Sequence, residues 1–213
     1  MHQLTDPAVY RALTALLVLG PQTPMLFQGQ EFAASAPFVY FADHQPELAD
    51  KVKKGRLEFL GQFPSLASAR MRWQIPDPSD PAVFESCRLD HSERARNAQA
   101  HALHRDLIRL RREDPAFGSP RAGAVDGAVL GDDVFVLRFF AHRENDRLLL
   151  INLDRDFQLR PAPEPLLAPV AGKEWRLVWS SEDPRYGGLG AAPAENPDRW
   201  FIPGKGAFVF ALS

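Results

Sequence analysis

Hydrophobic positions in the first thirty residues recur at helical spacing and then stop abruptly. A capping signal at residues 5–7, Thr-Asp-Pro, precedes apolar residues three to four positions apart, and Gly20-Pro21 ends them. This pattern predicts a helix over residues 7–19. The apolar run 25–28 is too short for another helix before Gly29, so it predicts a buried strand. A helix followed by such a strand is half of an α/β repeat.

Two further helices are predicted downstream. Residues 46–60 form one candidate, and residues 97–112 form the other, with leucines on one side and arginines at the carboxyl end, where the helix dipole favours them. Pro115 closes the second helix. The long connection between residues 32 and 96 is typical of a functional loop or an inserted subdomain.

The pattern changes after residue 117. Short apolar runs rich in Val, Phe and Trp, separated by glycines and prolines, predict an antiparallel sheet or sandwich; they cover residues 134–140, 147–153, 174–179 and 207–212. We therefore predict two domains, 1–117 and 118–213, with the boundary near 117–121. The β-rich part is expected to fold better alone than the helical part does.

Composition narrows the class of protein. The chain has 213 residues, 45% hydrophobic and 24% charged, which are globular values, and its formal net charge of −2 does not favour nucleic acid or an anionic membrane surface as a partner. One cysteine, Cys87, excludes an intramolecular disulfide and fits a cytoplasmic protein. The amino terminus lacks the basic start of a signal peptide, and the apolar run 12–19 is too short to span a bilayer.

Residues 23–44, TPMLFQGQEFAASAPFVYFADH, carry the strongest motif of the chain. The segment resembles one in the malto-oligosyltrehalose trehalohydrolases of the α-amylase superfamily, which typically reads Thr-Pro-Met-Leu-Phe-Met-Gly-Glu-Glu-Phe-Gly-Ala-Ser-Thr-Pro-Phe. The similarity covers most of residues 5–117, including the Pro-Asp-Pro segment at 76–81 and the helix around 107–116. Departures from the pattern are Gln28, Gln30, Ala33 and His91. Gln30 replaces a usual glutamate, which changes local charge and hydrogen bonding.

The resemblance implies a fold and an activity. Residues 1–117 would be the last part of a (β/α)8 TIM barrel, and an antiparallel β-sandwich would follow. The family hydrolyses the α-1,4 bond next to the terminal trehalose of a maltooligosyl-trehalose. Retaining glycosidases need two carboxyl groups about 5–5.5 Å apart, and in this superfamily they follow earlier barrel strands. We therefore assign no catalytic residue and no cofactor here, expect the chain alone to be inactive, and expect the missing barrel portion as its partner.

Five residues are candidates for substrate binding. Glu31 would lie at the mouth of the predicted strand, where it would bind substrate or shape the pocket, and a purely structural role is the alternative. Asp43 and His44 are expected to bind sugar hydroxyls, or else to fix the loop. Phe38 and Phe41 are expected to stack on glucose rings, and core packing is the alternative for both.

Other groups of residues give little indication of a catalytic or metal-binding site. His101 and His104 share a helix face, but no further ligands at matching geometry accompany them, so packing or exposure is favoured over metal binding. A non-catalytic module that binds glucan or braces a barrel is an alternative function, with stacking candidates in the β-rich part: Trp175, Trp179, Trp200 and Phe201. A fragment of a branching or other amylase-type enzyme is the third possibility, and the continuation from Ser35 to His44 argues against it.

Overall fold

The computed structural model describes residues 4–66, 68–72, 74–118, 123–141, 145–196 and 199–213. The chain forms two compact units: a larger unit of residues 1–33 and 94–213, and a smaller unit of residues 34–93. Part of the predicted boundary, residues 119–121, lies outside the described residues. The helices directly before it and the strands after it belong to the same compact unit, residues 1–33 and 94–213. The division into 1–117 and 118–213 therefore stays a prediction about the family's architecture.

The carboxy-terminal half of the larger unit consists of two antiparallel sheets, as predicted. The first has the strand order β1-β2-β3-β8-β5, and the second has the order β4-β7-β6. The strands are β1 (Val125–Gly131), β2 (Val134–Phe139), β3 (Arg147–Asn152), β4 (Phe157–Leu159), β5 (Trp175–Ser180), β6 (Ala194–Asn196), β7 (Arg199–Ile202) and β8 (Gly206–Leu212). The four predicted runs correspond to β2, β3, β5 and β8, and the sequence patterns missed the other four strands.

The central strands of the five-stranded sheet are buried on both faces. In β3, Leu148 and Leu150 pack into one cluster with Ile202 of the second sheet, whereas Leu149 and Ile151 pack into a second cluster with helical residues. A strand covered on both faces reads as a continuous apolar run rather than an alternating one. This explains the run of apolar residues in β3 and places one hydrophobic layer on each side of the sheet.

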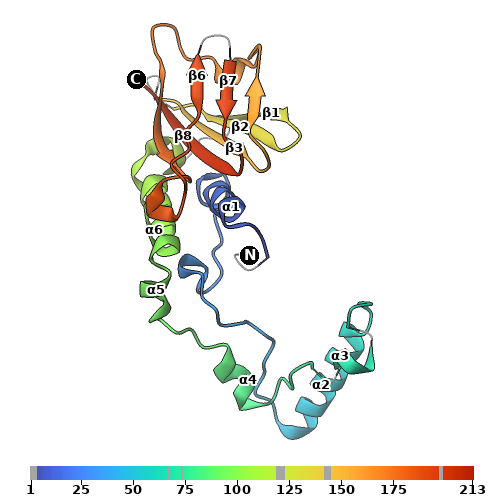
Figure 1. Cartoon of the computed structure of the whole chain (residues 1–213). Helices are drawn as coiled ribbons and strands as arrows, with labels where there is room; N and C mark the ends of the chain where they lie inside the picture. Colours follow the sequence, from blue (N-terminus) through green and yellow to red (C-terminus); the bar gives the residue numbers. More distant parts are fainter. Residues whose placement is uncertain (1–3, 67, 73, 119–122, 142–144, 197–198) are drawn as a thin grey trace. The chain divides into compact units, whose positions relative to one another are not determined.

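Helices cover the second face of this sheet (Figure 1). They are α1 (Pro7–Leu19), α6 (Ala98–Glu113) and α7 (Pro115–Gly118), and most of their buried hydrophobic residues belong to the same cluster as Leu149. Asp6 caps α1 by accepting a hydrogen bond from the Ala8 amide at 2.8 Å. The Arg111 guanidinium of α6 donates to the carbonyl oxygens of Val18 at 2.6 Å and Gly20 at 2.8 Å, at the end of α1. The strands and these helices share one hydrophobic cluster, and the expectation that the β-rich part folds better alone than the helical part does stays a prediction.

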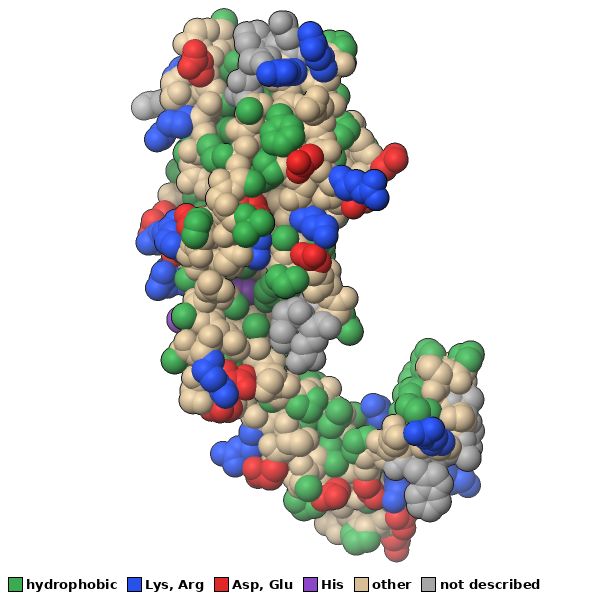
Figure 2. Space-filling model, in the orientation of Figure 1, with side chains coloured by type: hydrophobic (Ala, Val, Ile, Leu, Met, Phe, Trp, Pro, Cys, Tyr) green, Lys and Arg blue, Asp and Glu red, His purple; other side chains and the backbone are tan. Residues whose placement is uncertain are grey.

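The smaller unit is sparsely packed. Its helices are α2 (Pro46–Leu60), α3 (Ala69–Arg72) and α4 (Pro81–Ser86), and α5 (Glu93–Arg96) begins at its last residue. The predicted helix 46–60 is confirmed, although none of its residues is buried. Hydrophobic side chains lie among charged ones on the surface of this unit (Figure 2).

The predicted strand at residues 25–28 is wrong. These residues belong to neither sheet, and they end at a turn before the 3-10 helix η1 (Gln30–Phe32). Met25 is 85% exposed and Phe27 55% exposed. A strand needs a neighbouring strand to satisfy its backbone groups, and no strand among the described residues pairs with this segment. The end of a TIM barrel therefore stays a prediction for this chain.

Candidate functional site

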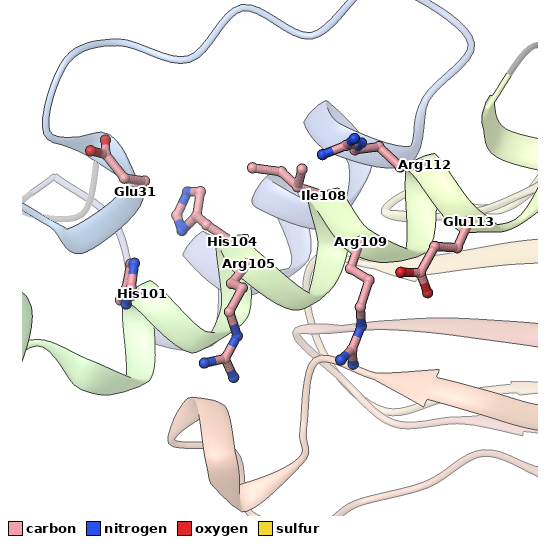
Figure 3. Close-up of a pocket in the computed structure, with 8 residues that line it drawn as sticks. All are labelled: Glu31, His101, His104, Arg105, Ile108, Arg109, Arg112 and Glu113. Atoms are coloured by element: carbon pink, nitrogen blue, oxygen red, sulfur yellow. The ribbon is translucent and has the colours of Figure 1, made fainter.

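Glu31 lines a cavity of about 570 Å³ in the larger unit. The opposite wall is formed by α6, whose side chains follow one another along the cavity (Figure 3). The lining residues are Glu31, His101, His104, Arg105, Ile108, Arg109, Arg112 and Glu113. The structure thus places one of the predicted binding residues in a defined cavity and adds two histidines to it.

The backbone around Glu31 is held from both sides. Gly29 adopts φ 77°, a left-handed conformation that favours glycine, and this turns the chain into η1. The Tyr10 hydroxyl donates to the Gln30 carbonyl at 3.2 Å. The Asn97 amide donates to the Phe32 carbonyl at 2.9 Å and to the Ala33 carbonyl at 3.2 Å. The turn that carries Glu31 is therefore tied to α1 and to the start of α6.

His104 is the most deeply buried polar group in the cavity wall. The residue is only 1% exposed, and its Nδ1 atom lies 2.9 Å from the Ala100 carbonyl oxygen. Burial lowers the pKa of His104, and the Glu31 carboxylate partly offsets this. The ring is therefore neutral near pH 7, and its contact with the carbonyl assigns the proton to Nδ1. This leaves Nε2 as an acceptor, and Nε2 has no hydrogen-bond partner.

The cationic side chains of the cavity are compensated by carboxylates. Arg105 and Arg109 lie 3.2 Å and 3.6 Å from Asp106 Oδ1, and Asp106 is buried. Glu113 stands at the far end of the cavity (Figure 3). The site is therefore rich in polar groups without a large excess of either charge.

The other four predicted binding residues belong to the smaller unit. Phe38 and Phe41 meet edge to face with ring centroids 5.9 Å apart, and Phe41 packs in the same way on Phe84 at 5.1 Å. Phe38 is 54% exposed, so its ring is partly available to a ligand. Asp43 and His44 are both exposed on the loop that precedes α2. The structure groups the two phenylalanines, whereas Glu31 lies in the larger unit.

The tryptophans considered for glucan stacking are core residues. Trp175, Trp179 and Trp200 are 7%, 8% and 3% exposed. Trp175 Nε1 donates to the Leu167 carbonyl at 2.8 Å, and Trp179 Nε1 donates to the Tyr186 hydroxyl at 3.2 Å. Little of their surface is exposed, so the structure does not favour these three residues for stacking on glucan.

The part of the chain that the structure describes shows neither a cluster of metal ligands nor a helix able to span a membrane. No group of three or more His, Cys, Asp or Glu there is placed to hold a metal ion. No described helix combines the length and apolar character needed to cross a membrane.

Curated relatives match the chain over much of its length. Proteins named malto-oligosyltrehalose trehalohydrolase are 39% identical over 149 residues in Deinococcus radiodurans, 43% over 123 residues in Arthrobacter ramosus, and 34% over 174 residues in Mycobacterium tuberculosis. These alignments cover 69%, 55% and 80% of this chain. The chain is a relative of the malto-oligosyltrehalose trehalohydrolases. It spans about a quarter of their length, with 24%, 20% and 27% of each covered.

Two further comparisons agree with this relationship to the trehalohydrolases. The family described as "Domain of unknown function (DUF3459)" matches residues 122–196. A candidate alpha amylase from Salmonella typhimurium superimposes with a TM-score of 0.70 at 19% sequence identity, and the match covers 99% of this chain and 32% of that protein. The alpha-amylase of H. orenii superimposes with a TM-score of 0.55 at 16% sequence identity, and the match covers 98% of this chain and 36% of that protein. The resemblance predicted from residues 23–44 is confirmed, and the fold is alpha-amylase-like.

Sequence reasoning missed His104 as part of the cavity wall opposite Glu31. The pair His101 and His104 at helical spacing was visible, but its interpretation as packing did not reveal the unsatisfied Nε2. That atom is buried because Tyr10 of α1 lies against the ring, with centroids 6.3 Å apart, and Glu31 lies beside it (Figure 3). The signal that could have found it is a histidine near the start of a predicted inner helix, combined with an acid after an apolar run.

Proposed function

We propose that this chain is the carboxy-terminal portion of a trehalohydrolase-type glycoside hydrolase, which cleaves the α-1,4-glucosidic bond next to the terminal trehalose of a maltooligosyl-trehalose and releases trehalose. The observation that carries the proposal is the 39% identity over 149 residues to a relative of that name. Its superfamily is supported by alpha-amylase-like structural neighbours that cover nearly the whole chain. The substrate class is accordingly an α-glucan with a trehalose end.

The chain by itself is proposed to be inactive. Glu31 and Glu113 line the same cavity, but Glu31 lies beside His104 and Glu113 lies about 13 Å further along α6, at ~1.5 Å per residue. Retaining glycosidases need two carboxyl groups about 5–5.5 Å apart. The catalytic carboxylates would then come from a barrel portion outside this chain, and this portion is its proposed partner.

The predicted binding residues supply the sugar contacts in this proposal. The Phe38 and Phe41 pair presents an aromatic edge and a partly exposed ring, which suits the C–H faces of glucose. Asp43 and His44 are exposed and follow in the same loop, where they can exchange hydrogen bonds with hydroxyls. Glu31 binds or shapes a separate part of the substrate site. The single cysteine fits the cytoplasm as the proposed compartment.

A complementation assay tests the proposal. The Deinococcus radiodurans relative is truncated so that the segment matching this chain is removed, and this chain is co-expressed with the remainder. Maltotriosyl-trehalose is the substrate, and the relative's own removed segment is the control. Trehalose release with both segments supports the proposal. Release with the control segment alone contradicts it, and so does trehalose release by this chain without the remainder, because the chain is proposed to lack the catalytic pair.

A bracing module is the second candidate function. The covering of one sheet face by α1 and α6 favours it over glucan binding, since the sandwich is joined to helices by a shared hydrophobic cluster. The same assay separates the candidates, including the amylase-type alternative. Branched products without trehalose would indicate a branching enzyme, and a remainder that is stabilised but makes no trehalose would indicate bracing alone.

A further inference from the structure

A groove of about 710 Å³ lies beside β5, the outermost strand of the five-stranded sheet. Its walls come from β5 itself, from the segment that connects β4 to β5, and from the second sheet. Leu177, Pro169 and Pro193 line it and are exposed or half-buried, whereas Trp175 and Trp200 are nearly fully buried. A molecule in the groove would therefore contact aliphatic and proline side chains rather than the faces of the tryptophan rings.

The groove carries negative charge. Glu164 is half-buried and Glu174 is exposed, and no basic residue is among the described residues that line the groove. Glu164 Oε1 accepts a hydrogen bond from the Leu166 amide at 2.9 Å, which leaves its second oxygen available. Neither carboxylate forms an ion pair with a residue that the structure describes. Apolar walls with two unpaired carboxylates favour an occupant that combines apolar and positively charged groups.

The strand beside the groove has a free backbone edge. Among the described strands, β5 pairs only with β8. Glu174 and Ser213 exchange two backbone hydrogen bonds, at 3.3 and 3.0 Å, and such pairs alternate with non-bonded pairs in an antiparallel ladder. The amide and carbonyl groups of Trp175 and Leu177 therefore point away from β8. No hydrogen bond joins these groups to another described residue.

The free edge and the groove together select an extended peptide as the occupant. A strand added to β5 would pair with the backbone of Trp175 and Leu177, and every second side chain of that strand would enter the groove. A small cation would reach the carboxylates but would leave the row of backbone groups unpaired. Lys or Pro often blocks a free edge, but β5 contains neither, and its Arg176 lies on the opposite face from Leu177.

We propose that the edge of β5 and this groove form a docking site for an extended basic peptide segment of another protein. The segment adds to β5 as a strand and places apolar side chains against Leu177, Pro169 and Pro193. Its Lys or Arg side chains lie near Glu164 and Glu174. The inference goes beyond the proposed hydrolase, because it gives the sandwich a binding role that involves neither glucan nor the barrel portion.

Fluorescence anisotropy of a labelled peptide tests the proposal on the full chain. The peptide Lys-Thr-Val-Thr-Leu-Thr-Lys presents lysine and apolar side chains on one face of a strand and threonines on the other. We expect saturable binding at low salt with a Kd below about 1 mM, and weaker binding when NaCl rises from about 25 to about 250 mM, because salt screens the ion pairs. The charge-reversed peptide Glu-Thr-Val-Thr-Leu-Thr-Glu should show no saturable binding.

Variants locate the site. Leu177→Lys places a cation in the groove without removing a hydrogen bond to β8, and it is expected to abolish binding. The double variant Glu164→Gln with Glu174→Gln should weaken binding about three- to tenfold, as loss of two partly exposed ion pairs does. Asp126→Asn is the matched control and should bind like the wild type, because this exposed acid lies on β1, the other outer strand of the sheet. Circular dichroism checks the folding of each variant, and the glutamine variant decides the test if Leu177→Lys unfolds.

Hydrogen exchange followed by NMR tests the strand pairing itself. The bound basic peptide is expected to slow exchange at the amides of Trp175 and Leu177 and to leave the amides of β1 unchanged. Binding without slower exchange at those two amides would contradict strand addition.

Three further results would overturn the proposal. One is the absence of saturable binding up to about 1 mM peptide. Another is equal binding of the basic and the charge-reversed peptide, or binding unchanged in the glutamine variant. The third is displacement of the peptide by maltotetraose, which would mean that the groove binds glucan. The complementation assay does not depend on any of these results, so failure of this site and failure of the proposed function are distinguishable.

Discussion

The larger and smaller units of this chain are built in opposite ways. In the larger unit, hydrophobic clusters lie on both faces of the five-stranded sheet, and they include fully buried residues such as Phe117, Phe139 and Phe208. In the smaller unit the buried residues are few and mostly small, among them Val83 and Cys87. The aromatic side chains that the structure describes in this unit are instead exposed or partly exposed.

This difference predicts that substitutions in the larger unit change mainly stability, whereas substitutions in the smaller unit change mainly binding. A unit with a two-sided core loses much free energy when one large side chain is removed, because the cavity cannot collapse. A unit whose aromatic rings are half exposed loses little, but those rings remain available to a ligand. We therefore expect the larger unit to dominate the unfolding transition and the smaller unit to tolerate substitutions that alter only binding.

The largest expected effect is at Phe117. The residue is fully buried and packs edge to face on Phe139 with ring centroids 4.8 Å apart. We expect Phe117→Ala to lower the free energy of unfolding by about 3–5 kcal/mol, measured by urea denaturation followed by circular dichroism. Phe84→Ala in the smaller unit is the matched control, because Phe84 is 49% exposed, and its loss should cost under about 1 kcal/mol. Equal losses from both variants would break the comparison.

The next effect concerns a buried ion pair that joins α1 to the loop after β5. Arg11 Nη2 donates to Glu182 Oε1 at 2.6 Å, and both side chains are under one-tenth exposed. Glu182→Ala leaves the guanidinium buried without its partner and is expected to cost about 3 kcal/mol in the same assay.

An exposed pair provides the contrast for that variant. Lys53 and Asp77 of the smaller unit are also 2.6 Å apart, but their side chains are 49% and 34% exposed. Asp77→Asn is expected to leave the unfolding curve unchanged within error, because water screens the pair. A large destabilisation by Asp77→Asn, or none by Glu182→Ala, would show that the burial of an ion pair does not determine its contribution to stability in the two units.

A smaller loss of stability is expected when the Tyr186 hydroxyl, which connects α6 to the sheet, is removed. Tyr186 donates to Asp106 Oδ2 at 2.9 Å and accepts from Trp179 Nε1 at 3.2 Å. Tyr186→Phe removes both contacts and should cost about 1–2 kcal/mol.

The pH dependence of the Tyr186→Phe variant tests the same contact. Burial, with the Asp106 carboxylate beside the ring, raises the pKa of Tyr186 to about 12 from an ordinary value of 10.0. The folded state then holds a proton that the unfolded state releases, so the wild type loses stability as the pH rises from 10 towards 12. The variant should lack this part of the loss, and an identical alkaline profile would contradict the contact.

The smallest effect is the acid dependence set by His104. Burial lowers its pKa below the ordinary 6.5, and the groups facing it are Glu31 from η1, Tyr10 from α1 and His101 from its own helix. The unfolded state takes up a proton that the folded state refuses, so stability is full above about pH 6.5 and falls as the pH drops below it, with a slope of at most about 1.4 kcal/mol per pH unit. Urea midpoints of wild type and His104→Phe between pH 7.5 and 5.5 measure this. Parallel profiles would rule the effect out.

Local signals in the sequence were sufficient to predict the long helices and most of the long strands. Asp6 and Gly20 mark the two ends of α1, and the runs in β2, β3, β5 and β8 are apolar enough to be recognised as strands. β1 was missed because Asp126, Gly127 and Gly131 dilute its pattern. The segment 25–28 was misassigned because a strand depends on a neighbour that local sequence does not reveal.

The site was less predictable than the fold. Glu31 was found from its position after an apolar run, although the run is not a strand. The burial of His104 results from packing between α1, η1 and α6, and α1 and η1 precede α6 by about 70 to 100 positions in the chain. Such tertiary packing is not encoded in the spacing of residues along one helix, so only the structure shows that Nε2 is left without a partner.

Native-state hydrogen exchange measured by mass spectrometry tests the contrast between the two units most directly. If α1 and α6 form one cooperative unit with the sandwich, their amides should exchange as slowly as those of β3 and β8, through the same global opening, while the amides of α2 exchange much faster. Fast exchange in α1 and α6 beside protected strands, or protection of α2 equal to that of β3, would contradict the account.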